Sequence, residues 1–232
     1  MSPRVTRRAL LAGGLTLSAT GWLGTTACTT TSQPEAPIPT PPTAPSSNAR
    51  SPSDGGPGAR VLLAYFSRAG ENYYYGGRRD LEVGNTEVLA GMIAELIDCD
   101  MHRIEAADPY PDDYDATVQR NVTEQDEDAR PGIANPLTSI AAYDTVLLGS
   151  PIWNVRAPMI MTTLTEAHDF AGKTVLPFVT YAVSGLGSVQ RDYTRSCRGA
   201  QIGEGLAVRG EEVNQSHADV EDWLQTAGLL RR

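Results

Sequence analysis

The stretch Val61–Phe66, with the sequence VLLAYF, is apolar at every position, and Ser67 and Arg68 follow it at once. Two further runs have the same character, TVLL at 145–148 and TVLPFVT at 174–180. Strands buried on both faces have this continuous apolar pattern, because helices cover both sides of the sheet to which they belong. The sequence therefore predicts a buried parallel β-sheet.

Helical patterns separate these strands. The clearest lies at 89–97, where apolar residues recur at the spacing of one helix face. A second helix is expected after Pro158, a polar and solvent-facing one within 112–130, and a last one around Trp223. These segments supply the crossovers that parallel strands need.

Two weaker strands are expected at 101–105 and 205–208. The resulting order, a strand followed by a helix five times over, predicts an α/β fold: a doubly wound, five-stranded parallel sheet with helices on both faces. In such sheets ligands bind at the carboxyl ends of the strands. The loops that leave those ends are therefore the places to look for chemistry.

The loop after the first strand has the features of an anion site. Ser67 and Arg68 open it, an excursion at 69–83 follows, and Asn85 and Thr86 stand where the next helix begins. At the start of a helix, the free backbone N–H groups and the positive end of the helix dipole attract an anion. Asn85 could equally be only an N-cap. We interpret the excursion as a lid or a partner surface.

Aromatic residues mark the other two loops. Trp153 lies in the loop at 149–158, where it either packs on the next helix or stacks on a flat heterocycle. Tyr181 opens a loop of small residues and glycines at 181–188. Three such loops at one sheet edge favour a phosphorylated planar ligand.

Two motif pairs make the pattern specific. Tyr-Phe-Ser-Arg at 65–68 with Gly-Asn-Thr at 84–86, and Gly-Ser-Pro-Ile-Trp at 149–153 with Ala-Pro at 157–158, resemble the flavodoxin-like family, and the similarity covers residues 60–229. The resemblance implies the strand order 2-1-3-4-5 and flavin mononucleotide (FMN) as the cofactor. It implies that the FMN phosphate is surrounded by Ser67, Arg68, Asn85 and Thr86, that the isoalloxazine ring is bordered by Pro151, Ile152, Trp153 and Asn154, and that the far rim of the ring is met by Tyr181, Ser184 and Gly185.

The chain departs from this family in three places. The excursion at 69–83 interrupts a loop that is compact in simple flavodoxins, Val155 stands where relatives often have glycine, and Ala182-Val183 replaces glycine-rich chain. Valine is more restricted than glycine in its backbone conformation. These departures bear on redox tuning more than on binding.

The first 59 residues predict export. The uncharged stretch at 12–27 is too short for a comfortable membrane span and has the layout of a secretory signal, and the Arg7-Arg8 pair before it resembles a twin-arginine signal. Residues 25–28 resemble a lipoprotein cleavage box with Cys28 as the lipid-bearing residue; the alternative is an ordinary cleaved signal. We therefore expect a signal peptide at 1–28, a disordered linker rich in Pro, Ser and Thr at 29–59, and the FMN-binding domain at 60–232.

Charge and composition narrow the function. A formal net charge of −9 argues against nucleic acid as a partner.

The expected role is an FMN-binding redox protein on the outer face of the bacterial plasma membrane, touching the membrane only through its lipid tether. Its partner would be a redox protein or a small quinone-like acceptor. A flavin-free adaptor lipoprotein is the alternative, and a solute-binding lipoprotein is disfavoured because no second lobe is present.

No catalytic acid or base and no metal site are expected, because the flavin carries the chemistry and no metal-ligand spacing occurs. Cys99 and Cys197 fall towards opposite edges of the expected sheet, too far apart for a disulfide. We expect both to be unpaired and largely buried. The oligomeric state stays open.

Overall fold

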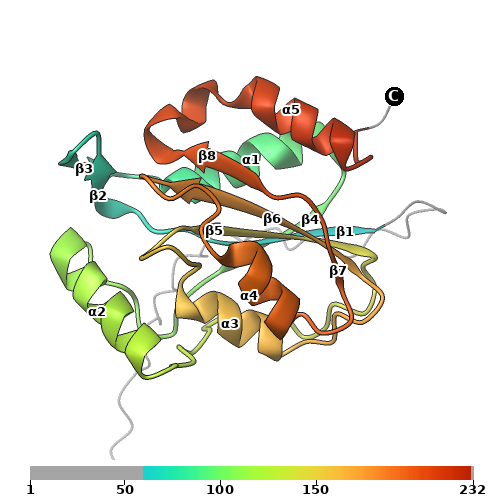
Figure 1. Ribbon diagram of the computed structural model, residues 1–232, viewed down its shortest axis with the longest axis horizontal. Coiled ribbons are helices and arrows are strands. Elements are labelled where there is room, and N and C mark those ends of the chain that lie inside the picture. The colour runs from blue at the N-terminus through green and yellow to red at the C-terminus, as the bar shows by residue number, and fades with distance from the viewer. Residues whose placement is uncertain (1–59, 231–232) are drawn as a thin grey trace, which may run out of the picture. The chain divides into compact units, whose positions relative to one another are not determined.

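The computed structural model describes residues 60–230, and Cys28 with the predicted signal and linker lies outside them. One parallel sheet forms the centre of this part of the chain (Figure 1). Its strands are β1 (Val61–Phe66), β4 (Asp100–Ile104), β5 (Thr145–Pro151), β6 (Thr174–Tyr181), β7 (Gln201–Ile202) and β8 (Leu206–Arg209).

The strand order is β4-β1-β5-β6, after which β7 and β8 both pair with β6. This is the expected order 2-1-3-4-5, with the fifth position divided between two short strands. The break between them falls at Gly203 and Gly205, where a Cβ atom would meet the side chains of Leu176 and Leu186 respectively. The fold class predicted from the sequence is therefore confirmed.

Helices cover both faces of the sheet (Figure 1). On one face lie α1 (Asn85–Leu96) and α5 (His217–Thr226), and on the other α3 (Met159–Glu166) and α4 (Val189–Ser196). Alternate residues of β1 enter the two cores: Leu62 packs with the α3 and α4 side, and Leu63 with the α1 and α5 side. The continuous apolar run of β1 is the direct consequence of this double burial.

The excursion is a β-hairpin, which the sequence analysis did not foresee. Strands β2 (Gly70–Tyr74) and β3 (Gly77–Leu81) form a separate antiparallel sheet. Tyr75 and Gly76, both with positive φ, make the turn between them, as two-residue hairpin turns require. The hairpin therefore leaves the end of β1 and returns to the start of α1.

Helix α2 (Tyr114–Asp126) fills the segment expected to face solvent. Only the outer face of α2 is exposed to solvent. Asn121 and Glu124 are buried, and Glu124 accepts a hydrogen bond from Tyr110 Oη at 2.8 Å and pairs with Arg120. The expectation of a wholly solvent-facing helix is thus corrected, because the polar side chains on the inner face find partners when buried.

Residues 60–230 contain no helix with both the length and the apolar character needed to cross a bilayer. Cys99 and Cys197 are free, as expected; Cys197 is buried, whereas Cys99 is only half-buried. Burial raises the pKa of the Cys99 thiol to about 11 and that of Cys197 to about 12.

We expect both thiols to react slowly in the folded protein, because alkylation requires the thiolate and at pH 8 at most about a hundredth of either group is ionised. Iodoacetamide labelling read by peptide mapping should show labelling of Cys99 and Cys197 at least about tenfold slower than in an unfolded control. Labelling of Cys197 at the unfolded rate would contradict its burial.

Candidate functional site

The start of α1 is pressed against the end of β1. Gly84, which precedes the helix, leaves no space for a side chain: a Cβ there would collide with Ser67 Oγ and the Arg68 carbonyl. Ser67 Oγ takes the place of a capping side chain by accepting the Glu87 N–H at 3.1 Å. The sequence folds this way locally because only glycine permits so close an approach.

This arrangement leaves hydrogen-bond donors free at the helix start. Among the interactions of residues 60–230, none engages the backbone N–H of Asn85 or of Thr86. These groups have no acceptor inside the helix. With the positive end of the helix dipole they form the anion site that the sequence predicts at this loop.

Arg68 is committed to the backbone. Its guanidinium donates to the carbonyls of Pro111 at 2.9 Å and Asp112 at 3.0 Å, and also to that of Glu71. It makes no ion pair within residues 60–230, and its buried Nε has no hydrogen-bond partner. Burial lowers the pKa of Arg68, and the nearby carboxylates of Asp112 and Glu71 oppose that shift. Arg68 thus brings positive charge to the site while it fixes the base of the hairpin.

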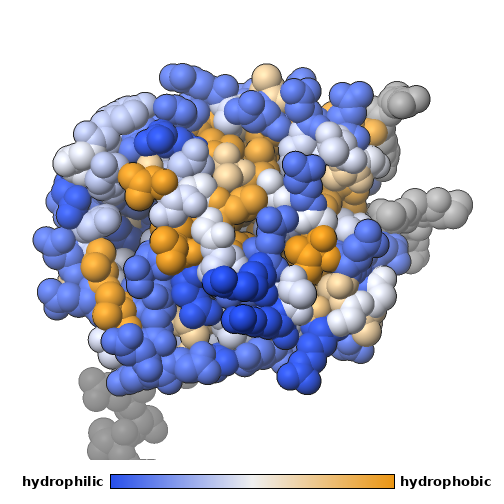
Figure 2. All heavy atoms as spheres, in the orientation of Figure 1, coloured by the Kyte–Doolittle hydropathy of each residue, from blue (hydrophilic) through white to orange (hydrophobic). Residues whose placement is uncertain are grey.

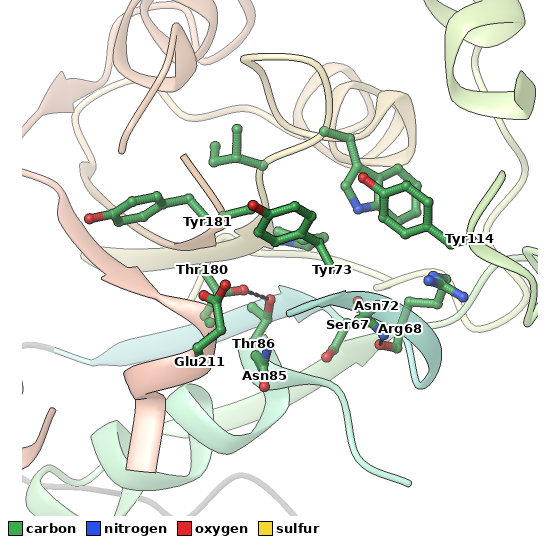
Figure 3. A pocket seen from close by; sticks show the side chains of 15 residues that line it. Ser67, Arg68, Asn72, Tyr73, Asn85, Thr86, Tyr114, Thr180, Tyr181 and Glu211 are labelled. Carbon is green, nitrogen blue, oxygen red and sulfur yellow. Dashed lines mark hydrogen bonds between the residues drawn. The ribbon is translucent and has the colours of Figure 1, made fainter. Parts of the chain in front are cut away.

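A narrow cavity of about 80 Å³ lies between these groups and the aromatic loops (Figure 3). Thr86 closes its floor by sharing a 2.7 Å hydrogen bond with Thr180 at the end of β6. Tyr73 of the hairpin lies over it, between Tyr181 and Tyr114 (Figure 3). Of the residues predicted from sequence, the cavity is lined by Ser67, Arg68, Asn85, Thr86, Pro151, Ile152, Trp153 and Tyr181.

A second cavity of about 300 Å³ adjoins the first on the side of α2. Asn154 lines this second cavity, together with Arg68, Ile152 and Trp153, which line both. Ser184 and Gly185 line neither of the two, although both were expected at the rim of the ring. The predicted residues of the first two loops thus line these cavities, whereas of the third loop's predicted residues only Tyr181 does.

Trp153 has both of the roles considered from sequence. Its ring packs edge-on against Phe66, with centroids 5.7 Å apart, and against Tyr110, at 5.1 Å. It also lines both cavities. Replacing it would therefore disturb the core as well as the site, so Trp153 alone cannot separate binding from stability.

A tight turn holds Trp153. The Trp153 N–H donates to the Arg156 carbonyl at 2.9 Å, and Asn154 and Val155 between them have φ angles of 48° and 62°. A left-handed conformation at both central residues defines a type I′ turn. For the β-branched Val155 it is strained, by about 1–3 kcal/mol.

Gln125 of α2 fastens this turn. Its Nε2 donates to the Trp153 carbonyl at 3.2 Å and to Asn121 Oδ1 at 3.1 Å, while its Oε1 accepts from Asn154 Nδ2 at 2.9 Å. Sequence reasoning missed this residue, since nothing in a polar helix indicates which amide meets a loop 28 positions away.

Glu211 was also missed, as was the short helix η1 (Gly210–Gln215) that carries it. It lines the narrow cavity beside Asn85 and Thr86 (Figure 3). Its Oε1 accepts the Tyr75 N–H at 3.0 Å, which ties the hairpin tip to the sheet edge, and its buried Oε2 has no hydrogen-bond partner. The cavity therefore holds negative as well as positive charge.

Within the part of the chain that the structure describes, no group of three or more His, Cys, Asp or Glu side chains is placed to hold a metal ion.

The chain is similar to a known protein family. A family model described as flavodoxin matches residues 80–227. The chain belongs to the flavodoxin family. The matched region begins at residue 80, within the excursion, so it includes Asn85 and Thr86 but not Ser67 and Arg68. No curated protein matches the chain.

Solved structures show the same flavodoxin fold. A protein of Bacteroides eggerthii DSM 20697, provisionally classed as a flavoprotein, is 26% identical over 74% of this chain and 99% of its own, with a TM-score of 0.60. A provisionally classed flavoprotein of Bacteroides uniformis ATCC 8492 is 30% identical over 72% and 99%, with a TM-score of 0.57. A flavoprotein of Lactobacillus acidophilus NCFM, solved in complex with FMN, is 17% identical over 68% and 98%, with a TM-score of 0.50, and shows the fold alone.

The strain at Val155 can be measured. Val155 is 55% exposed, so trimming its side chain removes few contacts. At ordinary positions glycine is less stable than alanine by about 0.5–1 kcal/mol. At this left-handed position we expect the reverse, with Val155→Gly about 1 kcal/mol more stable than Val155→Ala. Denaturant unfolding of the two variants checks this, and an alanine variant of equal or greater stability would rule out the strain.

Proposed function

We propose that this flavodoxin-family protein binds FMN at the carboxyl edge of its sheet and works as a redox protein of the cell envelope. It would serve as an electron carrier or as a reductase of a small quinone-type acceptor. The observation that carries the proposal is the convergence, in one cavity, of the free N–H groups of Asn85 and Thr86 with Trp153 and Tyr181. When bound, FMN supplies the electron transfer, and the protein supplies binding and orientation.

The residues present fit the two ends of FMN. A dianionic phosphate suits the start of α1, where free donors and the helix dipole meet beside Arg68. A flat aromatic ring suits the loops of Trp153 and Tyr181. A pocket for a ligand of this size usually measures about 300–1,000 Å³. FMN binding therefore requires Tyr73 and the hairpin to move off the narrow cavity.

The anion site can be tested at Thr86, whose side chain is 1% exposed. Loss of one hydrogen bond to a charged group costs about 1.5–3 kcal/mol. Thr86→Val should therefore weaken FMN binding about ten- to a hundredfold and leave riboflavin, which lacks the phosphate, nearly unchanged. Fluorescence titration of both ligands gives the two dissociation constants.

Thr180→Val is the matched control, because it breaks the same threonine pair from the other side and leaves the hydroxyl at the helix start. Thr180→Val should therefore weaken FMN binding less than Thr86→Val does. Equal losses for FMN and riboflavin in Thr86→Val would mean that the residue only supports the fold.

Glu211 should oppose phosphate binding, because its carboxylate lines the same cavity as Asn85 and Thr86. Glu211→Gln removes the charge and keeps an oxygen that can accept the Tyr75 N–H. Removing a like charge at this range is worth about 1 kcal/mol, so FMN affinity should rise about fivefold while riboflavin affinity hardly changes. A fall in FMN affinity would show that the carboxylate binds the ligand instead of repelling it.

The envelope location is part of the proposal and rests on the Arg7-Arg8 signal and the Cys28 motif. Export of folded protein suits a chain that acquires its cofactor before it crosses the membrane. Replacement of Cys28 with Ala, followed by cell fractionation, should release the protein from the membrane. Unchanged membrane association would eliminate the tether.

One observation favours the second candidate, a flavin-free adaptor: Tyr73 covers a cavity of only about 80 Å³. The two candidates differ in colour. Protein purified without added cofactor should show the visible absorbance of bound flavin if the first holds. Colourless protein that also fails to take up added FMN would favour the adaptor.

A further inference from the structure

The second cavity, which we call the α2 cavity, adjoins the narrow cavity, and both are lined by Arg68, Asn72, Tyr114, Ile152 and Trp153. Its walls come from α2 and from the turn at 152–154. Only the α2 cavity is lined by Thr117, Val118, Asn121, Val122 and Asn154, whereas only the narrow cavity is lined by Asn85, Thr86 and Tyr181. The two cavities thus meet along a shared wall that includes Trp153, and the α2 cavity extends from that wall along α2.

The wall formed by α2 is unusually apolar for that helix. Val118 and Val122, one turn apart, line the cavity, and each side chain is 41% exposed. The helix is otherwise dominated by polar residues, with the sequence YDATVQRNVTEQD. Apolar side chains reach the surface over α2 among hydrophilic neighbours (Figure 2). With the rings of Trp153 and Tyr114, the two valines present flat and aliphatic surfaces to whatever enters.

The charge of the α2 cavity selects against cations. Arg68 is the one charged residue among those that line it, and no carboxylate of residues 60–230 does so, although the chain has 28 acidic residues. The remaining polar lining consists of hydroxyl and amide side chains, among them Asn72, Asn121 and Asn154. A cation would meet the positive charge of Arg68 and no carboxylate, whereas an uncharged or anionic ligand meets no charge of its own sign.

The wall is also held in place. Gln125 joins Asn121, Asn154 and the Trp153 carbonyl through three hydrogen bonds of 2.9–3.2 Å. These bonds fix the turn on α2, so this wall of the cavity is preformed and ligand binding costs it little ordering. Its volume of about 300 Å³ is that of a ligand pocket for a small molecule.

We propose that the α2 cavity binds a planar aromatic molecule that carries carbonyl or anionic acceptor groups and no positive charge. Its binding rests on the α2 cavity alone. Its role, as the small acceptor that approaches the flavin across Trp153, rests on the proposed function.

The test uses 2-methyl-1,4-naphthoquinone, which is planar, uncharged and carries two carbonyl groups, and N-methylquinolinium, which is similar in size and cationic. Calorimetric titration should find one site for the naphthoquinone in FMN-free and in FMN-loaded protein. The quinolinium should bind at least about tenfold more weakly, since Arg68 repels it and no carboxylate attracts it.

Variants at the exposed wall locate the site. Val118→Asp should weaken naphthoquinone binding about tenfold, because the ligand would desolvate a carboxylate. Val118→Thr, of the same shape and uncharged, should stay within about twofold. Met101→Asp adds the same charge on β4, at a position that is 48% exposed and lines neither cavity, and it should leave binding unchanged. FMN affinity should be the same in all three variants.

Three results would overturn the site: no naphthoquinone binding, competition between the naphthoquinone and FMN, or equal weakening of naphthoquinone binding by Val118→Asp and Met101→Asp. Competition in particular would make the α2 cavity a part of the flavin site. Naphthoquinone binding to a protein that takes up no FMN would support the site and contradict the proposed function, so the two can fail separately.

Discussion

The close approach of Gly84 to Ser67 and Arg68 is the constraint on which the rest of the site depends. It places the first N–H groups of α1 directly at the carboxyl end of β1, where a charged ligand can reach them. It also fixes where the hairpin begins and ends, since β2 and β3 lie between those same residues. A larger residue at 84 would separate helix from strand and open both the anion site and the hairpin base.

Two charges of opposite sign, on Arg68 and Glu211, lie beside the start of α1. Within residues 60–230, the Arg68 guanidinium donates only to backbone carbonyls, whereas Glu211 has one carboxylate oxygen bonded to the hairpin tip and one without a hydrogen-bond partner. The cation is tied to the base of the hairpin and the anion to its tip. A phosphate at the start of α1 would be attracted to the first and repelled by the second. Ligand binding and the position of the hairpin are thereby coupled through Glu211.

Much of the fold can be predicted from the sequence, because strands that are buried on both faces are apolar at every position. The continuous apolar run at 61–66 and the helical spacing at 89–97 are local consequences of the layers that cover the sheet. The anion loop is equally local, since Ser67 and Thr86 stand at the ends of adjoining elements. Even Trp153, marked by its neighbours in a loop, was placed at the correct edge.

What escaped prediction depends on contacts between distant segments. The hairpin GENYYYGGRRDL lacks apolar alternation, because it packs through Arg68, Glu71 and Arg78 on the polar start of α2 and not on a core. Glu211 reaches Tyr75 across 136 positions. Val118 becomes part of a cavity wall only because α2 packs beside the turn of Trp153.

We propose that the free N–H groups at the start of α1 hold the phosphate of FMN. Amide hydrogen exchange at Asn85 and Thr86, measured by NMR with FMN, with riboflavin and without ligand, tests it most directly. We expect exchange of these two amides to be at least about tenfold slower with FMN than with riboflavin, because only the phosphate would accept their hydrogen bonds. Equal protection by both flavins, or none by FMN, would contradict it.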